Sequence, residues 1–193
     1  MKRLFIAINL PFEIKEEIVR LVEQIDREKK FSQKQGFRWL TKENWHLTIT
    51  FLGNQPEEAI PIILQSMEEV SQEYSTIFKN SGIFIRFEKI IFAPSIRPRM
   101  IWLTTAKETS ETLNKLKNKL DESLIKSGIY FKKENRQFQG HLTLARFEPR
   151  AIKKTEILEV QDLIFQPKSF DLMESQLFRS GAEYVVIEKI NFK

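Results

Sequence analysis

The sequence predicts a mixed fold of helices and strands, built as two similar lobes related by a pseudo-twofold axis. Strand-type and helix-type hydrophobic patterns alternate along all 193 residues. Arg3-Leu4-Phe5-Ile6 matches Arg99-Met100-Ile101-Trp102 at an offset of 96 residues, and His46 matches His141 at an offset of 95. Each half therefore reads strand, helix, histidine-bearing strand, helix, which places the two histidine strands symmetrically.

The first half begins with an apolar strand over residues 4–8. After Pro11, apolar residues at helical spacing predict an amphipathic helix with the stripe Ile14, Ile18, Leu21, Val22 and Ile25. Residues 37–40 form a short extended piece after a turn at Gly36, and residues 46–52 form a β-prone run closed by Gly53. A second helix follows, with the stripe Ile60, Ile63, Leu64, Met67 and Val70.

The second half begins after two extended segments, residues 83–92 and 100–104. A helix then ends at Gly128, a residue typical of a left-handed cap, and its stripe is Leu113, Leu116, Leu120 and Leu124. Residues 141–147 form the second histidine strand. A weak helix over residues 155–160 and closing strands at 170–178 and 184–190 complete the chain.

We therefore expect one bilobal domain over residues 1–193, made by an internal duplication with approximate repeats 1–95 and 96–193. The alternative is a chance similarity between two β/α stretches.

Composition excludes several classes of function. The chain has no cysteine, which excludes disulfides, thiolate nucleophiles and cysteine-ligated zinc. No stretch approaches the roughly 20 apolar residues of a membrane span, so we expect a soluble, cytoplasmic protein. The 31 Lys and Arg residues exceed the 26 Asp and Glu residues, giving a net charge of +5. This charge favours an anionic partner such as nucleic acid, but a solvated surface rich in Lys and Glu explains it equally well.

The two histidines of the chain lie in the same tetrapeptide pattern, His46-Leu47-Thr48-Ile49 and His141-Leu142-Thr143-Leu144. Alternate residues of a strand share a face, so each histidine points the same way as its threonine while the neighbouring apolar residues point into the core. Each motif therefore offers an imidazole and a hydroxyl from one rigid strand.

This residue set fits the opening of a cyclic phosphodiester. His46 and His141 are the candidate catalytic acid–base pair, because histidine titrates near neutral pH and one ring must take a proton while the other gives one. Thr48 and Thr143 are candidate phosphate ligands. A lone histidine on a strand is more often structural, but the repeated motif favours catalysis.

Metal and nucleotide cofactors are not expected. Two histidines without cysteine or an HExxH pattern fall short of the three or four protein ligands that zinc sites recruit. The six glycines form no phosphate-binding loop, so ATP is not implied either.

The motifs and their flanking blocks resemble the two-histidine (2H) phosphoesterases, and within them the RNA 2′,3′-cyclic phosphodiesterases, also known as LigT-like 2′-5′ RNA ligases. The resemblance covers nearly the whole chain, in the blocks 3–8, 37–40, 43–48, 51–53, 92–102, 138–146 and 177–180. It implies an α+β fold with a central cleft and a hydrolase that opens 2′,3′-cyclic phosphates to 2′-phosphomonoesters. The implied partners are RNA ends, including tRNA fragments, or small cyclic nucleotides. We expect a monomer.

The resemblance assigns the catalytic and phosphate-binding roles to the same four motif residues, and adds Arg146 as a phosphate-binding arginine. Strict alternation from His141 puts Arg146 on the wrong face, so either a bulge re-aims it or the strand ends by Ala145; the alternative is a surface arginine in an ion pair. Relatives usually carry proline just before the second motif. This chain has Gln139-Gly140 there, which we expect to loosen the start of the strand.

Four further residues are candidate RNA contacts. Arg136 and Phe138 lie in the basic and aromatic segment 131–138, which suits phosphate contacts and base stacking, although a solvated loop with two buried phenylalanines is the plainer interpretation. Trp39 flanks the first motif. Arg99 has the place in the second repeat that Arg3 has in the first, and we expect it at the mouth of the cleft.

Three functions remain open: a hydrolase of cyclic phosphates, a 2′-5′ RNA ligase that joins tRNA halves, and a non-catalytic RNA-binding module of the same fold. The first two share one site. A module without turnover is expected to have lost a motif histidine or threonine, and all four are present. Sequence does not determine which histidine is the base.

Overall fold

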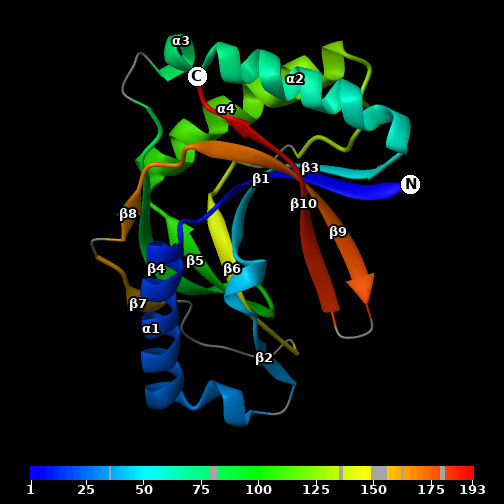
Figure 1. Cartoon of the computed structure of the whole chain (residues 1–193). Coiled ribbons are helices and arrows are strands. Elements are labelled where there is room, and N and C mark those ends of the chain that lie inside the picture. The colour runs from blue at the N-terminus through cyan, green and yellow to red at the C-terminus, as the bar shows by residue number, and fades with distance from the viewer. Residues whose placement is uncertain (35, 79–81, 135–136, 149–155, 162, 179–180) are drawn as a thin grey trace.

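The computed structural model describes residues 1–34, 36–78, 82–134, 137–148, 156–161, 163–178 and 181–193 (Figure 1). Its helices are α1 (Phe12–Lys29), α2 (Ile60–Gln72), α3 (Tyr74–Phe78) and α4 (Lys107–Lys126), with short 3₁₀ helices at Phe31–Gln33, Lys42–Asn44 and Glu57–Ala59. Its strands are β1 (Lys2–Asn9), β2 (Phe37–Trp39), β3 (His46–Gln55), β4 (Ile85–Ala93), β5 (Met100–Thr105), β6 (His141–Phe147), β7 (Glu156–Glu159), β8 (Ile164–Phe165), β9 (Ser169–Phe178) and β10 (Gly181–Asn191).

The strands form two antiparallel sheets, which confirms the α+β bilobal class. The first sheet has the order β10-β9-β1-β3, and the second has the order β2-β6-β5-β4-β7, with β8 pairing β4. Each sheet takes strands from both halves of the chain, because β2 and β4 join the second sheet while β9 and β10 join the first (Figure 1). The boundary between repeats near residue 95 stays a prediction.

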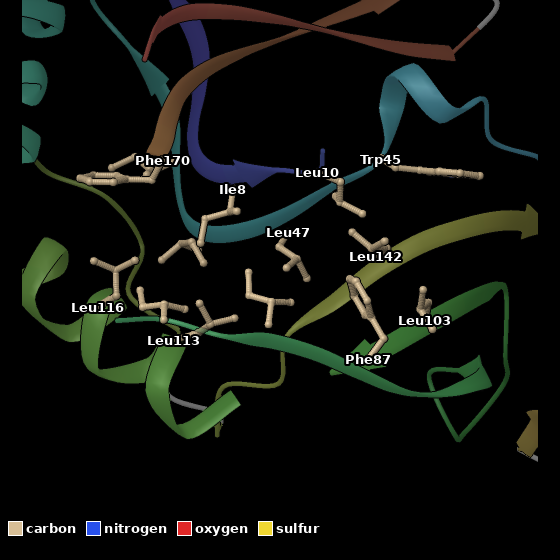
Figure 2. Close-up of a cluster of buried hydrophobic side chains, with 14 of the residues drawn as sticks. Ile8, Leu10, Trp45, Leu47, Phe87, Leu103, Leu113, Leu116, Leu142 and Phe170 are labelled. Atoms are coloured by element: carbon tan, nitrogen blue, oxygen red, sulfur yellow. The ribbon is translucent and has the colours of Figure 1, made fainter. Parts of the chain in front are cut away.

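The main hydrophobic core packs against both sheets, and a smaller cluster of Phe5, Ala7 and Met173 is separate from it. Figure 2 shows Leu47 of β3 and Leu142 of β6 in this core, with Leu113 of α4 beside them. All three side chains are fully buried, and burying a leucine stabilises a fold by about 2 kcal/mol. The core anchors one face of each histidine strand, so the opposite face is left for polar side chains.

The helices follow the predicted stripes. The α4 helix ends as expected, since Gly128 has φ +82 and the Ile129 N–H donates to the Leu124 carbonyl at 2.9 Å. Helices α2 and α4 pack against each other (Figure 1), with Ser66 and Ser127 hydroxyls 3.0 Å apart. In the described part of the chain, none of the helices has the length and apolar character that crossing a bilayer requires.

The weak helix predicted at residues 155–160 is wrong over its described part, because Glu156–Glu159 is strand β7. This segment pairs antiparallel with β4, with Leu158 opposite Ile90. Leu158 packs against the core and Val160 is buried, which is the two-residue period of a strand. Pairing with the edge of a sheet thus overrides a weak local preference. Residue 155 lies outside the described residues.

Candidate active site

The two histidine motifs have the same local structure. Residues 46–52 of β3 and 141–147 of β6 follow one exposure pattern, in which the histidine and the threonine are half-buried and the residues after them are buried. Leu47 and Leu142 face the core, as predicted. The polar pair of each motif therefore lies on the face of its sheet away from the core.

A bulge interrupts each strand directly after the threonine. In the first sheet Ala7 pairs with Thr48 but Ile6 pairs with Thr50, which leaves Ile49 without an opposite residue. In the second sheet Trp102 pairs with Thr143 but Ile101 pairs with Ala145. A bulge of this kind shifts the alternation by one residue.

Because of the bulges, the fifth residue after each histidine lies on the same face of the sheet as that histidine. Both Arg146 and Phe51 are exposed there, although each is preceded by two buried residues. Of the two expectations for Arg146, the bulge is therefore the one found, and its phosphate-binding role stays a prediction. Arg146 and Phe51 occupy equivalent positions in the two sheets, but one side chain is a guanidinium and the other is an aromatic ring.

The strand register corrects the repeat alignment at the start of each half. Ala7 lies opposite Thr48 and Trp102 lies opposite Thr143, and both differences, 102 − 7 and 143 − 48, equal 95. The offset of 96 was one residue too long, so Arg99 is not the equivalent of Arg3. Arg99 is exposed immediately before β5 and stays a candidate RNA contact.

The His141 ring is held in a defined orientation. Its Nδ1 lies 2.9 Å from the Gln139 carbonyl oxygen, which can only accept, so Nδ1 carries a proton and donates. The ring stacks on Trp102 with centroids 3.8 Å apart. Both contacts orient the ring.

The start of β6 is tightly held, which corrects the expectation that Gln139-Gly140 loosens it. Gly140 is buried, its N–H donates to the Ser110 hydroxyl at 3.2 Å, and its carbonyl accepts from the Thr105 N–H at 2.9 Å. A Cβ at Gly140 would lie 2.6 Å from Thr105 Oγ1 and 3.3 Å from Leu113 Cδ1. The glycine is therefore required by close packing beside the second histidine strand.

His46 lies in a drier environment than His141. Burial is the main cause that lowers the pKa of His46 to about 4; the Asn44 backbone opposes this, and Lys15 and His141 add to the lowering. Its Nδ1 is buried. Tyr184 packs edge-on at 4.6 Å between ring centroids. His46 is therefore neutral at pH 7.

A cavity of about 320 Å³ is lined by residues of both motifs, although His46 and Thr143 are not among them. It runs along the unpaired edge of β3, and both Thr48 and His141 line it. We call it the aromatic cavity, because its wall includes Phe51, Trp102, Phe131 and Phe138; the other lining residues are Ile49, Thr50, Lys117, Lys132, Glu134, Gln137 and Gln139. Phe138, a candidate RNA contact, thus faces the candidate site.

A second hollow, of about 430 Å³, lies on the His46 side and includes Arg38, Asn44 and Tyr184 in its wall. Arg38 lies directly opposite Arg146 on the paired strands β2 and β6. Both arginines are exposed, and a guanidinium is a frequent phosphate ligand, so the pair is a candidate anion contact.

Arg38 also approaches the β9–β10 hairpin, since a Cβ at Gly181 would lie 2.6 Å from its Nη2. Arg38 was not among the residues predicted from the sequence, and it is added here as a candidate contact. Only the register of the three-residue strand β2 against β6 reveals it.

Two of the candidate RNA contacts are Trp39 and Arg136. Trp39 points to the α1 side of β2, where its Nε1 donates to Asp26 at 3.0 Å and its ring packs against Phe37. Trp39 also lines the second hollow, and its RNA contact stays a prediction. Arg136 lies outside the described residues.

Among the described residues, no three or more histidine, cysteine, aspartate or glutamate side chains are grouped as a metal site would require.

The comparisons with known proteins agree on one family. A family model described as LigT-like phosphoesterase matches residues 8–102. The RNA 2′,3′-cyclic phosphodiesterase of Methanocaldococcus jannaschii is 32% identical to this chain, over 97% of this chain and 99% of the relative. The protein of the same name from Thermotoga maritima is 28% identical, over 99% and 96%. The crystal structure of apo Escherichia coli LigT matches with a TM-score of 0.74 at 25% identity, over 98% of this chain and 96% of that one.

Proposed function

Because the chain belongs to the LigT-like phosphoesterase family, we propose that it is an RNA 2′,3′-cyclic phosphodiesterase whose two histidines act as acid and base without a metal. The observation that carries the proposal is the meeting of Thr48 of one motif and His141 of the other at a single cavity. Full-length relatives with this name support the substrate class.

In the proposed reaction His46 is the general base. A base must be neutral before it can take a proton, and a pKa of about 4 keeps His46 neutral at pH 7. Water loses a proton to His46 as its oxygen attacks phosphorus. The bond from phosphorus to the ribose O3′ breaks, and His141 gives its Nε2 proton to the leaving O3′. The product carries a 2′-phosphate, as the family resemblance implies.

The charge that builds on the non-bridging oxygens is stabilised by donors on the histidine face. The hydroxyls of Thr48 and Thr143 lie two residues beyond each histidine and donate to these oxygens. Arg146 adds a positive charge on the same face of β6. These groups and two imidazoles together supply proton transfer and anion binding, so the proposed mechanism includes no metal.

The proposed substrates are RNA ends with 2′,3′-cyclic phosphates, including tRNA fragments, or small cyclic nucleotides. The net charge of +5 supports an anionic substrate. The lack of cysteine supports a reducing cytoplasm, where the protein acts as a monomer in this proposal.

The test is incubation of the purified protein with an oligonucleotide that ends in a 2′,3′-cyclic phosphate, in excess chelator. The expected product is a 2′-phosphomonoester, identified by phosphorus NMR. A 3′-phosphate product would contradict the assigned polarity. Activity that disappears with chelator and returns with a divalent ion would contradict the metal-free mechanism.

A further inference from the structure

A buried ion pair forms part of the aromatic cavity, and the reaction proposed above does not use it. On α4, Lys117 Nζ lies 2.5 Å from Asp121 Oδ2, and the two side chains are 9% and 0% exposed. The Thr50 hydroxyl donates to the other oxygen of Asp121 at 2.8 Å. Asp121 is therefore fixed from two elements, and it fixes Lys117 in turn.

A contribution to folding stability does not by itself explain why this ion pair is buried. Removing two charges from water is expensive, and apolar replacements of buried ion pairs are often neutral or stabilising. An ammonium has three N–H donors, and the bond to Asp121 uses one of them. Because Lys117 also lines the aromatic cavity, its remaining donors can be offered to a ligand there.

The remaining walls of the aromatic cavity fit a nucleobase. Phe51, Trp102, Phe131 and Phe138 give aromatic surface, and stacking on such rings is the usual way in which proteins hold unpaired bases. The volume of about 320 Å³ lies in the range of small-molecule sites. Thr48 and His141 border the same cavity, so a base within it can belong to the nucleotide whose cyclic phosphate is opened.

The charged groups of the cavity favour one base. Lys117 offers only donors and Glu134, at the exposed rim, offers only acceptors. Guanine presents the acceptors O6 and N7 to a lysine and the donors N1–H and N2–H₂ to a carboxylate. Adenine presents the N6 amino donor beside N7, so an ammonium meets one acceptor on that edge where guanine offers two. Cytosine has only one ring for stacking. Uracil covers less of the aromatic surface.

We propose that the aromatic cavity binds the base of the 3′-terminal nucleotide with a preference for guanine, and that Lys117 is the specificity-determining residue. This inference rests on the proposed function, since it places the base relative to the cyclic phosphate.

The test compares kcat/KM for 2′,3′-cyclic GMP and 2′,3′-cyclic AMP in wild type and in Lys117→Met. Wild type is expected to prefer the guanine substrate by about tenfold or more, the value of one good two-point base contact. Lys117→Met is expected to bring the ratio to within about twofold of unity, and Lys117→Arg to retain the preference. The ratio does not depend on the folded fraction, so partial unfolding of a variant cannot produce this result.

Lys119→Met is the matched control, because it removes the same charge from the same helix at a side chain that is 48% exposed and paired with Glu73. It is expected to leave the ratio unchanged. Equal kcat/KM for both substrates in wild type, or a guanine preference that survives in Lys117→Met, would overturn the inference.

Equilibrium binding of 2′-GMP and 2′-AMP separates this inference from the proposed function. The quenching of tryptophan fluorescence reports binding, because Trp102 lines the cavity. Tighter binding of 2′-GMP, lost in Lys117→Met, supports the base site even if neither cyclic nucleotide is hydrolysed, which would contradict the proposed function alone. Equal binding of the two nucleotides by wild type would count against the base site.

Discussion

Acidification from pH 8 to pH 5 is expected to remove about 2 kcal/mol of unfolding free energy through His46 alone. The pKa of this ring is about 4 in the folded protein and has its ordinary value of 6.5 in the unfolded chain. At pH 5 the unfolded chain binds a proton that the folded chain does not. This contribution to stability is complete above pH 6.5, falls as the pH drops towards 4, and totals about 3 kcal/mol.

The assay is urea unfolding of wild type and His46→Asn at pH 8 and pH 5. Subtracting the two pH dependences removes every titration that both proteins share, including that of His141. The wild type should lose about 2 kcal/mol more than the variant. NMR of the two imidazoles, assigned with the variant, measures the pKa directly. A His46 pKa near 6.5, or equal pH dependences of unfolding, would refute the argument that burial keeps this ring neutral.

The remaining predictions concern catalysis, RNA binding and packing. His46→Ala and His141→Ala should each lower kcat by about 10²- to 10⁴-fold while circular dichroism stays unchanged, and full activity in either would reject the pair. In wild type, the acidic limb of the kcat/KM profile should lie near pH 4, the pKa of His46, and a limb near 6.5 would exclude this ring as the base. Arg38→Ala and Arg146→Ala should each weaken oligonucleotide binding and reduce the slope of log affinity against log salt by about 0.7, and an unchanged slope would exclude phosphate contact. Gly140→Ala should lower the urea unfolding free energy by about 1–3 kcal/mol, because its Cβ would lie 2.6 Å from Thr105 Oγ1; no loss would show that the site can relax.

The faces of the histidine strands could be predicted because they depend only on local alternation. Leu47 and Leu142 point into the core and leave His46 and His141 on the other face. Arg146 could not be placed in this way, because a bulge is decided by how β5 and β6 pair, and two outcomes were equally consistent with the sequence. The resemblance to relatives implies a phosphate-binding role for Arg146, and the strand register shows on which face of the sheet it lies.

Residues whose role depends on tertiary contacts could hardly be identified from the sequence. The apolar stripe of α4 was evident from its leucines, but Lys117 and Asp121 lie on the buried side of the same helix and look like ordinary solvent-facing charges in a lysine-rich segment. Asp121 accepts a hydrogen bond from Thr50, which lies on a strand far away in the sequence. Likewise, β7 forms because the edge of β4 is available, which a local pattern does not reveal.

The pairing of the first strand with a strand near the end of the chain affects how the enzyme is made. Synthesis delivers β1 and β3 early, but β1 cannot gain its second neighbour until β9 has left the ribosome, since Leu4 pairs with Glu174. Tyr184, which packs on His46, arrives later still on β10. A nascent or truncated chain that ends before residue 169 would contain both histidine motifs but lack the strands that complete the first sheet. We therefore expect a chain without β9 and β10 to have an incomplete first sheet and to lack the ring that packs on His46.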